Sequence, residues 1–145
     1  MSELIFKEIR SCDVHEVMEI ERENPDPWNE LELIEMLKKK HVVGVIIGWP
    51  ADVGYRVLGF MLYEVKPCEI QVLNIAVKSQ FKRQLIGTRF LNYLTTMGKA
   101  VHINVRESNL PAQNFLKQCG FRAISIVPNF YPDKESAYHF RKAPC

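Results

Sequence analysis

The sequence predicts an α/β fold in which a mixed sheet is covered by helices on both faces. Two observations predict it. Segments with alternating or continuous apolar residues, typical of strands, are broken by single segments with an apolar stripe at helical spacing. The elements expected from these patterns follow the order βααβββαβαββ, which favours a sheet flanked by helices. The chain has 145 residues, of which 47% are hydrophobic. That is enough for one sizeable core, so we expect a single domain over 1–145.

The first half of the chain is expected to contain one strand, two helices and then three strands. The segment 4–10 alternates apolar and polar residues, which predicts a strand. Asp13 could cap the first helix. Asn29, with Glu32 three residues later, resembles a capping box and predicts the start of the second helix. The three β-rich segments that follow are 42–49, 55–66 and 69–77.

The second half is expected to alternate helices and strands before it ends in two strands. After the strand ending at residue 77, an amphipathic helix carries the apolar stripe Ile86, Phe90, Leu91, Leu94 and Met97. A later helix has Asn109 or Ser108 at its start, Pro111 in its first turn and Gly120 as its stop. The strands expected here are 100–106, 122–128 and 136–142.

Composition narrows the classes of function. The formal net charge of +2 is too small to indicate nucleic acid or an anionic membrane as a partner. The four cysteines lie far apart and form no CxxC pair, so no metal site is expected. No apolar run approaches the ~20 residues of a membrane span, and the N-terminal segment is charged too early for a signal peptide. These observations favour a cytoplasmic protein with reduced thiols.

The segment 79–91 suggests an anion site. Lys82 and Arg83 precede Gly87 in a turn that leads from a strand into an amphipathic helix. Unpaired N–H groups and the dipole at a helix start both favour anions. By itself, this segment fits an ordinary helix start equally well.

Two longer blocks make the sequence recognisable. The segment 73–94, LNIAVKSQFKRQLIGTRFLNYL, and the segment 103–121, INVRESNLPAQNFLKQCGF, resemble the Gcn5-related N-acetyltransferase family. The motifs PW at 27–28 and NFYP at 129–132 further resemble the bacterial ribosomal-protein alanine N-acetyltransferases and related protein N-terminal acetyltransferases. The resemblance implies the acyl-CoA N-acetyltransferase fold, with a mixed, mostly antiparallel twisted sheet flanked by helices on both faces.

The resemblance also implies acetyl-CoA as co-substrate and places its binding residues. The backbone of Ile75, Ala76 and Val77 would hold the pantetheine arm and direct an N–H at the thioester oxygen. Asn109 would contact the cofactor from the start of the later helix. The turn that would wrap the pyrophosphate consists of Lys82, Arg83, Gln84, Leu85, Ile86, Gly87 and Thr88.

One residue of that turn departs from the family's pattern. The family usually has glycine where this chain has Leu85, because glycine lets the backbone approach a phosphate closely. We expect Leu85 to allow the same approach only if its side chain turns away and its φ is negative. Lys82 stands where the family has Arg or Gln and could act as a point charge.

The catalytic residues depart from the pattern as well. The reaction expected is attack of an amine on the acetyl thioester, which needs a neutral amine and a proton for the leaving thiolate. In the alanine acetyltransferases that the chain resembles, a Glu acts as base and a Tyr as acid. Here the matching positions are Asn104 and Leu116, and neither side chain can transfer protons.

Three interpretations of this departure are open. In the first, His102 acts as base, since it shares a strand face with Asn104 and histidine ordinarily titrates near ~6.5. Tyr131 would then donate to the thiolate or hold the amine through water. His102 could equally be a packed or surface histidine, and Tyr131 a loop residue that caps the core.

In the second interpretation, positioning suffices and Asn104 orients a water. An α-amine has a pKa of roughly 7.7–8.0 against ~10.4 for lysine, so at pH 7 its deprotonation costs only about 1 kcal/mol against over ~4 kcal/mol. In the third, the protein is a regulator that binds acetyl-CoA without turnover. We expect acetyl-CoA-dependent N-acetylation of a protein N-terminal α-amine, with a ribosomal protein as one candidate acceptor. A small-molecule amine is the enzymatic alternative.

Overall fold

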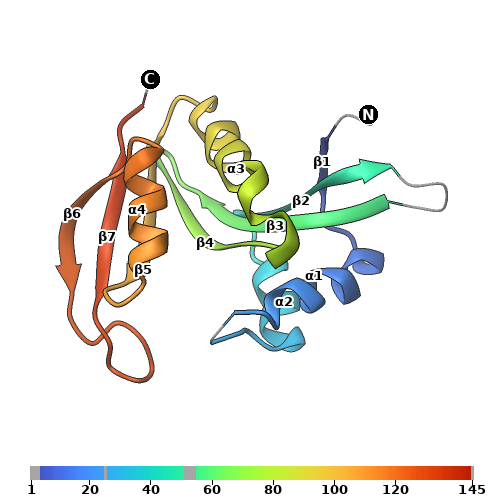
Figure 1. Cartoon of the computed structure of the whole chain (residues 1–145), viewed down its shortest axis with the longest axis horizontal. Helices are drawn as coiled ribbons and strands as arrows, with labels where there is room; N and C mark the ends of the chain where they lie inside the picture. The colour runs from blue at the N-terminus through green and yellow to red at the C-terminus, as the bar shows by residue number, and fades with distance from the viewer. Residues whose placement is uncertain (1–3, 25, 51–54, 145) are drawn as a thin grey trace. The chain divides into compact units, whose positions relative to one another are not determined.

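The computed structural model describes residues 4–24, 26–50 and 55–144, apart from the side chains of Lys82, Arg83 and Gln84. The predicted order βααβββαβαββ is confirmed, with two short 3₁₀ helices added (Figure 1). The elements are β1 Ile5–Glu8, η1 Ser11–Asp13, α1 Val14–Glu21, α2 Glu30–Leu37, β2 Val42–Pro50, β3 Tyr55–Val65, β4 Glu69–Val77, η2 Ser79–Gln84, α3 Ile86–Thr95, β5 Ala100–Arg106, α4 Leu110–Gln118, β6 Arg122–Val127 and β7 Ala137–Lys142.

The strands form one mixed sheet in the order β1-β2-β3-β4-β5-β7-β6. Among the pairings whose register is described, only β4 with β5 is parallel, which confirms the predicted mixed, mostly antiparallel sheet. Internal contacts group the chain into two compact units. Unit 1 comprises Met1–Val65 and Leu73–Phe90, and unit 2 comprises Lys66–Val72 and Leu91–Cys145. That they act as a single domain over 1–145 stays a prediction.

Helices cover both faces of the sheet within unit 1. On one face, apolar residues of α1 and α2 form a buried core with β2, β3 and β4 that includes Phe60. Gly59 precedes Phe60 and therefore points to the opposite face. There a Cβ on Gly59 would lie 3.2 Å from the ring of Phe90 in α3 and 2.9 Å from the Ala76 carbonyl oxygen. The absence of a side chain at residue 59 thus lets α3 and β4 approach closely.

The helix starts show which local predictions hold. Asn29 Oδ1 accepts from the Glu32 N–H at 2.8 Å and Glu32 Oε1 accepts from the Asn29 N–H at 3.2 Å, so the capping box is confirmed. The predicted cap by Asp13 is wrong. Asp13 closes η1 with helical φ −93° and ψ −13°, whereas a capping side chain requires extended backbone. Its carboxylate instead accepts from the Arg10 N–H at 2.9 Å and pairs with Lys7 at 3.6 Å.

In unit 2, the two faces of β5 differ sharply. Val101, Ile103 and Val105 are buried, and the alternating residues on the other face are polar and half-buried. Helix α4 contacts β5 and β7 through side chains, since Gln113 Nε2 donates to two carbonyls at the end of β5 and Lys142 Nζ donates to the Cys119 carbonyl. The polar face of β5 carries the residues that the sequence marked for catalysis.

Candidate active site

The predicted phosphate turn lies between β4 and α3 in unit 1. Leu85 joins η2 to α3 with φ 62° and ψ 21°, so a negative φ, one of the two conditions expected for a close approach, is not met. The chain reverses at this residue by entering the left-handed region, which glycine adopts without penalty and other residues adopt at about 1–2 kcal/mol. The Leu85 side chain is 68% exposed and does turn outward, as expected. The backbone therefore has the conformation that glycine favours although the glycine is missing.

The other predicted cofactor residues of unit 1 contribute mainly backbone. Ala76 and Ile86 are buried, and Ile75, Val77, Gly87 and Thr88 are half-buried. The buried side chains pack in the core, so only their backbone groups can reach a ligand. The side chains of Lys82, Arg83 and Gln84 lie outside the described residues. The pyrophosphate contacts of this turn stay a prediction.

Asn109 begins α4 in unit 2, where the sequence placed it. Its Oδ1 accepts from the Ala112 N–H at 3.2 Å, so the side chain acts as the helix cap. Its contact with the cofactor stays a prediction. In the same helix, Leu116, which the resemblance matches to the family's tyrosine, is 2% exposed and belongs to the core of unit 2.

Asn104 is the first of four side chains joined by hydrogen bonds across β5, β7 and β4. Asn104 Oδ1 lies 2.8 Å from Nδ1 of His139, and Nε2 of His139 lies 2.7 Å from Nδ1 of His102. Nε2 of His102 lies 2.8 Å from the Glu69 carboxylate. We call Asn104, His139, His102 and Glu69 the polar chain. Both ring nitrogens of His102 are engaged, so direct proton abstraction from a substrate would require one of these bonds to open.

The polar chain is half-buried, and its charges affect the titration of His139. Burial lowers the pKa of His139, the neighbouring His102 lowers it further, and Glu69 opposes both effects. His139 is therefore held in its neutral form. His139 and Glu69 could not be predicted from the sequence, because no local pattern marks them. Strand register alone brings His139 to Asn104 and Glu69 to His102.

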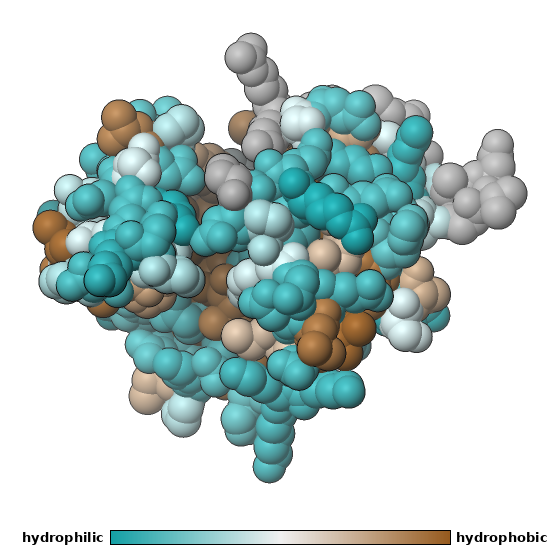
Figure 2. Space-filling model, turned by 90° about the horizontal axis from the view of Figure 1, so that it is seen from below, coloured by the Kyte–Doolittle hydropathy of each residue, from teal (hydrophilic) through white to brown (hydrophobic). Residues whose placement is uncertain are grey.

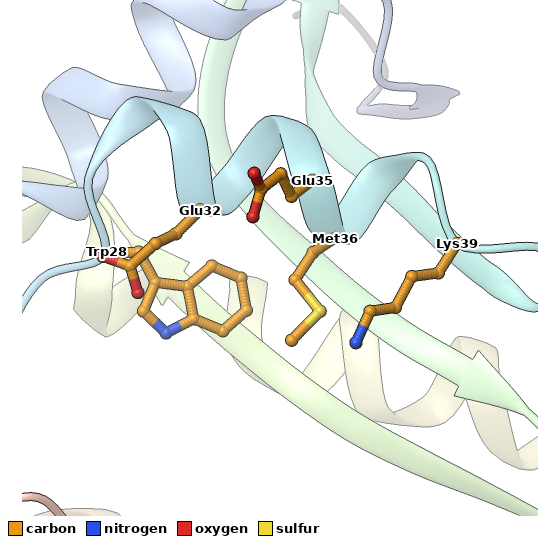
Figure 3. Close-up of a pocket in the computed structure, with 5 residues that line it drawn as sticks. All are labelled: Trp28, Glu32, Glu35, Met36 and Lys39. Atoms are coloured by element: carbon orange, nitrogen blue, oxygen red, sulfur yellow. The ribbon is translucent and has the colours of Figure 1, made fainter.

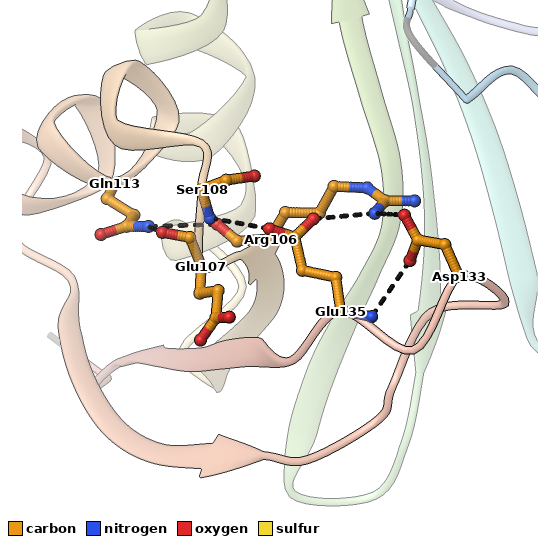
Figure 4. A network of polar contacts seen from close by, with 6 residues as sticks. All are labelled: Arg106, Glu107, Ser108, Gln113, Asp133 and Glu135. Atoms are coloured by element: carbon orange, nitrogen blue, oxygen red, sulfur yellow. Dashed lines mark hydrogen bonds and ion pairs between the residues drawn. The ribbon is translucent and has the colours of Figure 1, made fainter.

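A second polar network fixes the loop that carries Tyr131 (Figure 4). The Arg106 guanidinium donates to Asp133 and to Glu135, each at 2.8 Å. The same guanidinium lies 4.1 Å from the centre of the Tyr131 ring, within range of a cation–π interaction. The Ser108 N–H donates to Glu135 Oε2 at 3.1 Å. Tyr131, predicted to serve in catalysis, is thus held against the end of β5.

These contacts also lower the pKa of both carboxyl groups of the loop. The pKa of Asp133 is lowered mainly by the Glu135 N–H, with Arg106 as a further cause. The pKa of Glu135 is lowered mainly by its hydrogen bond with Ser108, followed by that with Arg106. Both carboxylates therefore stay ionised and keep the loop anchored in moderately acidic solution.

In unit 1, a pocket of about 270 Å³ opens along α2 (Figure 3). Its lining residues are Trp28, Glu32, Glu35, Met36 and Lys39. The close-up shows the Trp28 indole and the Met36 side chain on the same side of the helix. The pocket combines an apolar floor with charged side chains. On the molecular face drawn in Figure 2, hydrophilic residues predominate and hydrophobic ones form separate patches.

A buried carboxylate connects this pocket with β4. Glu21 is 3% exposed, and its oxygens accept from the Trp28 N–H at 2.8 Å, from Asn24 Nδ2 at 2.6 Å and from Asn74 Nδ2 at 3.1 Å. Three donors satisfy the buried charge. Glu21 thereby fixes the segment before α2 against the strand residue that precedes Ile75. In the sequence it lies within an acidic helix that resembles a solvated face.

Among residues 4–24, 26–50 and 55–144, no three or more His, Cys, Asp or Glu side chains come together in a way that could hold a metal ion. Nor does any helix there have the length and apolar character needed to cross a membrane.

Comparison with known proteins decides the family. The model of the acetyltransferase (GNAT) family matches residues 7–121, which include β4, the turn at Leu85 and the polar face of β5. The chain belongs to this family. An N-alpha-acetyltransferase from Sulfurisphaera tokodaii is 27% identical to it, and the alignment covers 92% of this chain and 89% of that protein.

Solved structures support the GNAT fold. The ribosomal-protein-S18-alanine N-acetyltransferase from Escherichia coli superposes with a TM-score of 0.82 at 22% identity, covering 98% of this chain and 94% of that one. Ard1 from Thermoplasma volcanium superposes with a TM-score of 0.83 at 20% identity, covering 96% of each chain. The predicted fold and family are therefore confirmed. Acetyl transfer, with acetyl-CoA as co-substrate, is the reaction of this family.

Proposed function

We propose that the chain transfers the acetyl group of acetyl-CoA to the α-amine of a protein N-terminus by direct attack in a ternary complex. The observation that carries the proposal is the environment of Asn104. Asn104 stands where the resemblance implies a glutamate base, its amide oxygen is hydrogen-bonded to His139, and both ring nitrogens of the neighbouring His102 are engaged as well. Such a site can orient an amine, but it is poorly suited to removing a proton from a strongly basic one.

The energetics of deprotonation then select the acceptor. At pH 7, an α-amine loses its proton at a cost of about 1 kcal/mol, whereas a lysine side chain requires over ~4 kcal/mol. Without an efficient base, a site of this kind serves α-amines and discriminates against lysine. The Sulfurisphaera tokodaii relative, whose name describes N-alpha-acetylation, supports the same acceptor class.

In the proposed reaction, the lone pair of the neutral amine attacks the thioester carbon and forms the C–N bond. The nitrogen then gives its extra proton to water and the tetrahedral oxyanion collapses. The C–S bond breaks, and the coenzyme A thiolate leaves and takes up a proton. Tyr131, held by Arg106 at the end of β5, is the proposed proton donor or the residue that holds the amine through water. The N–H groups of Ile75, Ala76 and Val77 are the proposed hydrogen-bond donors along the cofactor arm.

The acceptor protein is the finer part of the proposal. A ribosomal protein in the cytoplasm is the candidate that follows from the likeness to the ribosomal-protein-S18-alanine N-acetyltransferase. The acidic residues along α2 would favour a cationic N-terminal segment by charge complementarity.

The test combines calorimetry of acetyl-CoA binding with a thiol-release assay on matched peptides. One peptide has a free N-terminus and no lysine, and its partner has a blocked N-terminus and one internal lysine. We expect binding, and thiol release with the first peptide only. Release with the second peptide would refute the acceptor class. Release with small amines alone would establish the small-molecule alternative, and binding without any release would favour a regulator.

A further inference from the structure

The direction of each hydrogen bond in the polar chain follows from its two ends. Glu69 is a carboxylate and can only accept, so Nε2 of His102 must carry a proton. When Asn104 presents Oδ1, Nδ1 of His139 must carry a proton. Because burial lowers the pKa of His139, its Nε2 accepts, and the proton between the two rings lies on His102. The polar chain then holds one proton more than it does with both rings neutral.

Removal of one proton from the polar chain reverses two of its three bonds. His102 keeps its proton toward Glu69, so its Nδ1 becomes an acceptor and His139 must donate through Nε2. Nδ1 of His139 then has a lone pair, which only the Nδ2 group of Asn104 can satisfy. The amide therefore rotates by about 180°, a change that exchanges its oxygen and nitrogen with little change in shape.

We propose that the polar chain sets which end of the Asn104 amide faces the acceptor amine, with His139 as the positioning residue. The inference rests on the proposed function. When the polar chain has lost its proton, Oδ1 of Asn104 is turned outward and can accept an N–H of the amine. The amine lone pair is then left for attack on the thioester. When the polar chain is protonated, Nδ2 is turned outward and donates to that lone pair, which blocks attack.

Geometry and charge around the two rings support this assignment. The rings lie with centroids 4.9 Å apart, and the His102 side chain is 12% exposed, so water competes weakly for the link between them. The lowered pKa of His139 agrees with its assignment as the neutral ring. An amide cannot relay a proton as an imidazole does, so the polar chain orders the site rather than conducting a proton into it.

Several charged groups surround the polar chain in unit 2. On β4, Glu69 stabilises the imidazolium of His102, and Lys66 in turn pairs with Glu69 at 3.7 Å. On β7, Arg141 lies opposite His102, and on β6, Arg122 lies opposite Arg141, so both cations oppose the imidazolium.

Further neighbours border the other end of the polar chain. Ser125 of β6 lies opposite His139, and Arg106 follows Asn104 on the same face of β5. Arg106 is neutralised by Asp133 and Glu135. The positive and negative charges that surround the polar chain are therefore nearly equal in number, and they nearly cancel in their effect on the proton that switches it.

Nuclear magnetic resonance of the intact protein tests the rotation without any assay of activity. The chain has four histidines, and His15 and His41 are exposed, so their rings serve as internal controls. We expect His139 to remain neutral while its proton moves from Nδ1 to Nε2 as the pH rises. The side-chain amide resonances of Asn104 should shift over the same pH range. A His139 tautomer that stays fixed over the whole pH range in which the protein is folded would overturn the proposal.

Kinetics tests the consequence for catalysis. In the unaltered protein, attack needs both a deprotonated polar chain and a deprotonated amine. The logarithm of kcat/KM should therefore rise with a slope of about 2 below the midpoint at which the Asn104 amide rotates and about 1 above it. In His139→Phe, whose ring has no hydrogen-bonding group and cannot pass the reversal on to Asn104, the slope should be about 1 throughout, and acetyl-CoA binding should be unchanged. The matched control His41→Phe should keep both slopes.

The two experiments separate the two hypotheses. A slope of about 2 that persists in His139→Phe would overturn the role of His139, even if transfer to N-terminal peptides is confirmed. Absence of transfer to every peptide would overturn the proposed function and with it the catalytic role of the polar chain. The tautomer measurement would still decide whether the amide rotates.

Discussion

Leu85 and Asn104 are two positions at which the sequence predicts a departure from the family's pattern, and their surroundings differ. At Leu85, where the resemblance implies glycine, the backbone adopts the left-handed conformation that glycine favours, with the side chain turned to solvent. At Asn104, where the resemblance implies a glutamate base, two histidines and a carboxylate line up behind the amide. A role performed by backbone groups can survive a change of side chain, whereas a role performed by a side chain has to be rebuilt by its neighbours.

The largest effect is expected when the backbone of the turn is broken. Proline fixes φ near −65°, whereas Leu85 has φ 62°. Leu85→Pro should therefore distort the turn by at least about 3 kcal/mol and weaken acetyl-CoA binding about 100-fold. Calorimetry measures the binding, and a thermal melt verifies that the variant is folded. Unchanged affinity in a folded variant would show that the turn does not contact the cofactor.

The next effect should come from the side chain at residue 104. Asn104→Leu keeps the approximate size of the residue but removes both hydrogen-bonding groups, so kcat/KM for an N-terminal peptide should fall about 30-fold, or about 2 kcal/mol. Acetyl-CoA binding should not change. Asn92→Leu on the exposed side of α3 is the matched control. A fall of the same size in the control would remove Asn104 from the site.

A smaller effect is expected from the loop that carries Tyr131. Arg106→Met keeps the apolar stem but removes the ion pairs with Asp133 and Glu135 and the contact over the Tyr131 ring. The loop should become less ordered, and KM for the peptide should rise about 10-fold because binding then has to order it. Steady-state kinetics measures this change, and Arg56→Met on the exposed side of β3 is the control. A pure loss of kcat with constant KM would instead place Arg106 in the chemical step.

Stability should depend on pH through His139. Its pKa is lowered in the folded protein, so the unfolded chain binds this proton more tightly. The stabilisation is complete above the ordinary histidine pKa of ~6.5 and is lost as the pH falls below it. Urea unfolding at pH 8 and pH 5 should show a smaller loss of stability at pH 5 in His139→Gln than in the unaltered protein. An equal loss would mean that His139 titrates normally in the fold.

The smallest effect is expected when the glycine of the turn is restored. Leu85→Gly relieves about 1–2 kcal/mol of left-handed strain but gives the unfolded chain more freedom, which offsets about 0.5–1 kcal/mol. The net change in the free energy of unfolding should be about 1 kcal/mol or less. Affinity for acetyl-CoA should change by less than about 3-fold. A much larger gain in affinity would show that the Leu85 side chain obstructs the turn.

Most local features could be predicted from the sequence. The strands and helices appear in the predicted order, and the caps at Asn29 and Asn109 form as expected, because each depends on residues a few positions away. The cap at Asp13 failed because a 3₁₀ turn places this residue in helical backbone. The departures at Leu85 and Asn104 from the family's pattern could also be predicted from the sequence, because the motif around each residue identifies its position.

Tertiary structure decided the rest, because those contacts join residues far apart in the chain. Strand register brings His139 to Asn104 across 35 positions and to His102 across 37, and a buried carboxylate joins Glu21 to Asn74 across 53. The sign of φ at Leu85 was likewise set by how η2 must turn into α3. The sequence by itself determined which elements form and predicted which catalytic side chains of the family's pattern are replaced. The folded chain determined which side chains hydrogen-bond to the replacements, because hydrogen-bond partners are selected by distance in space.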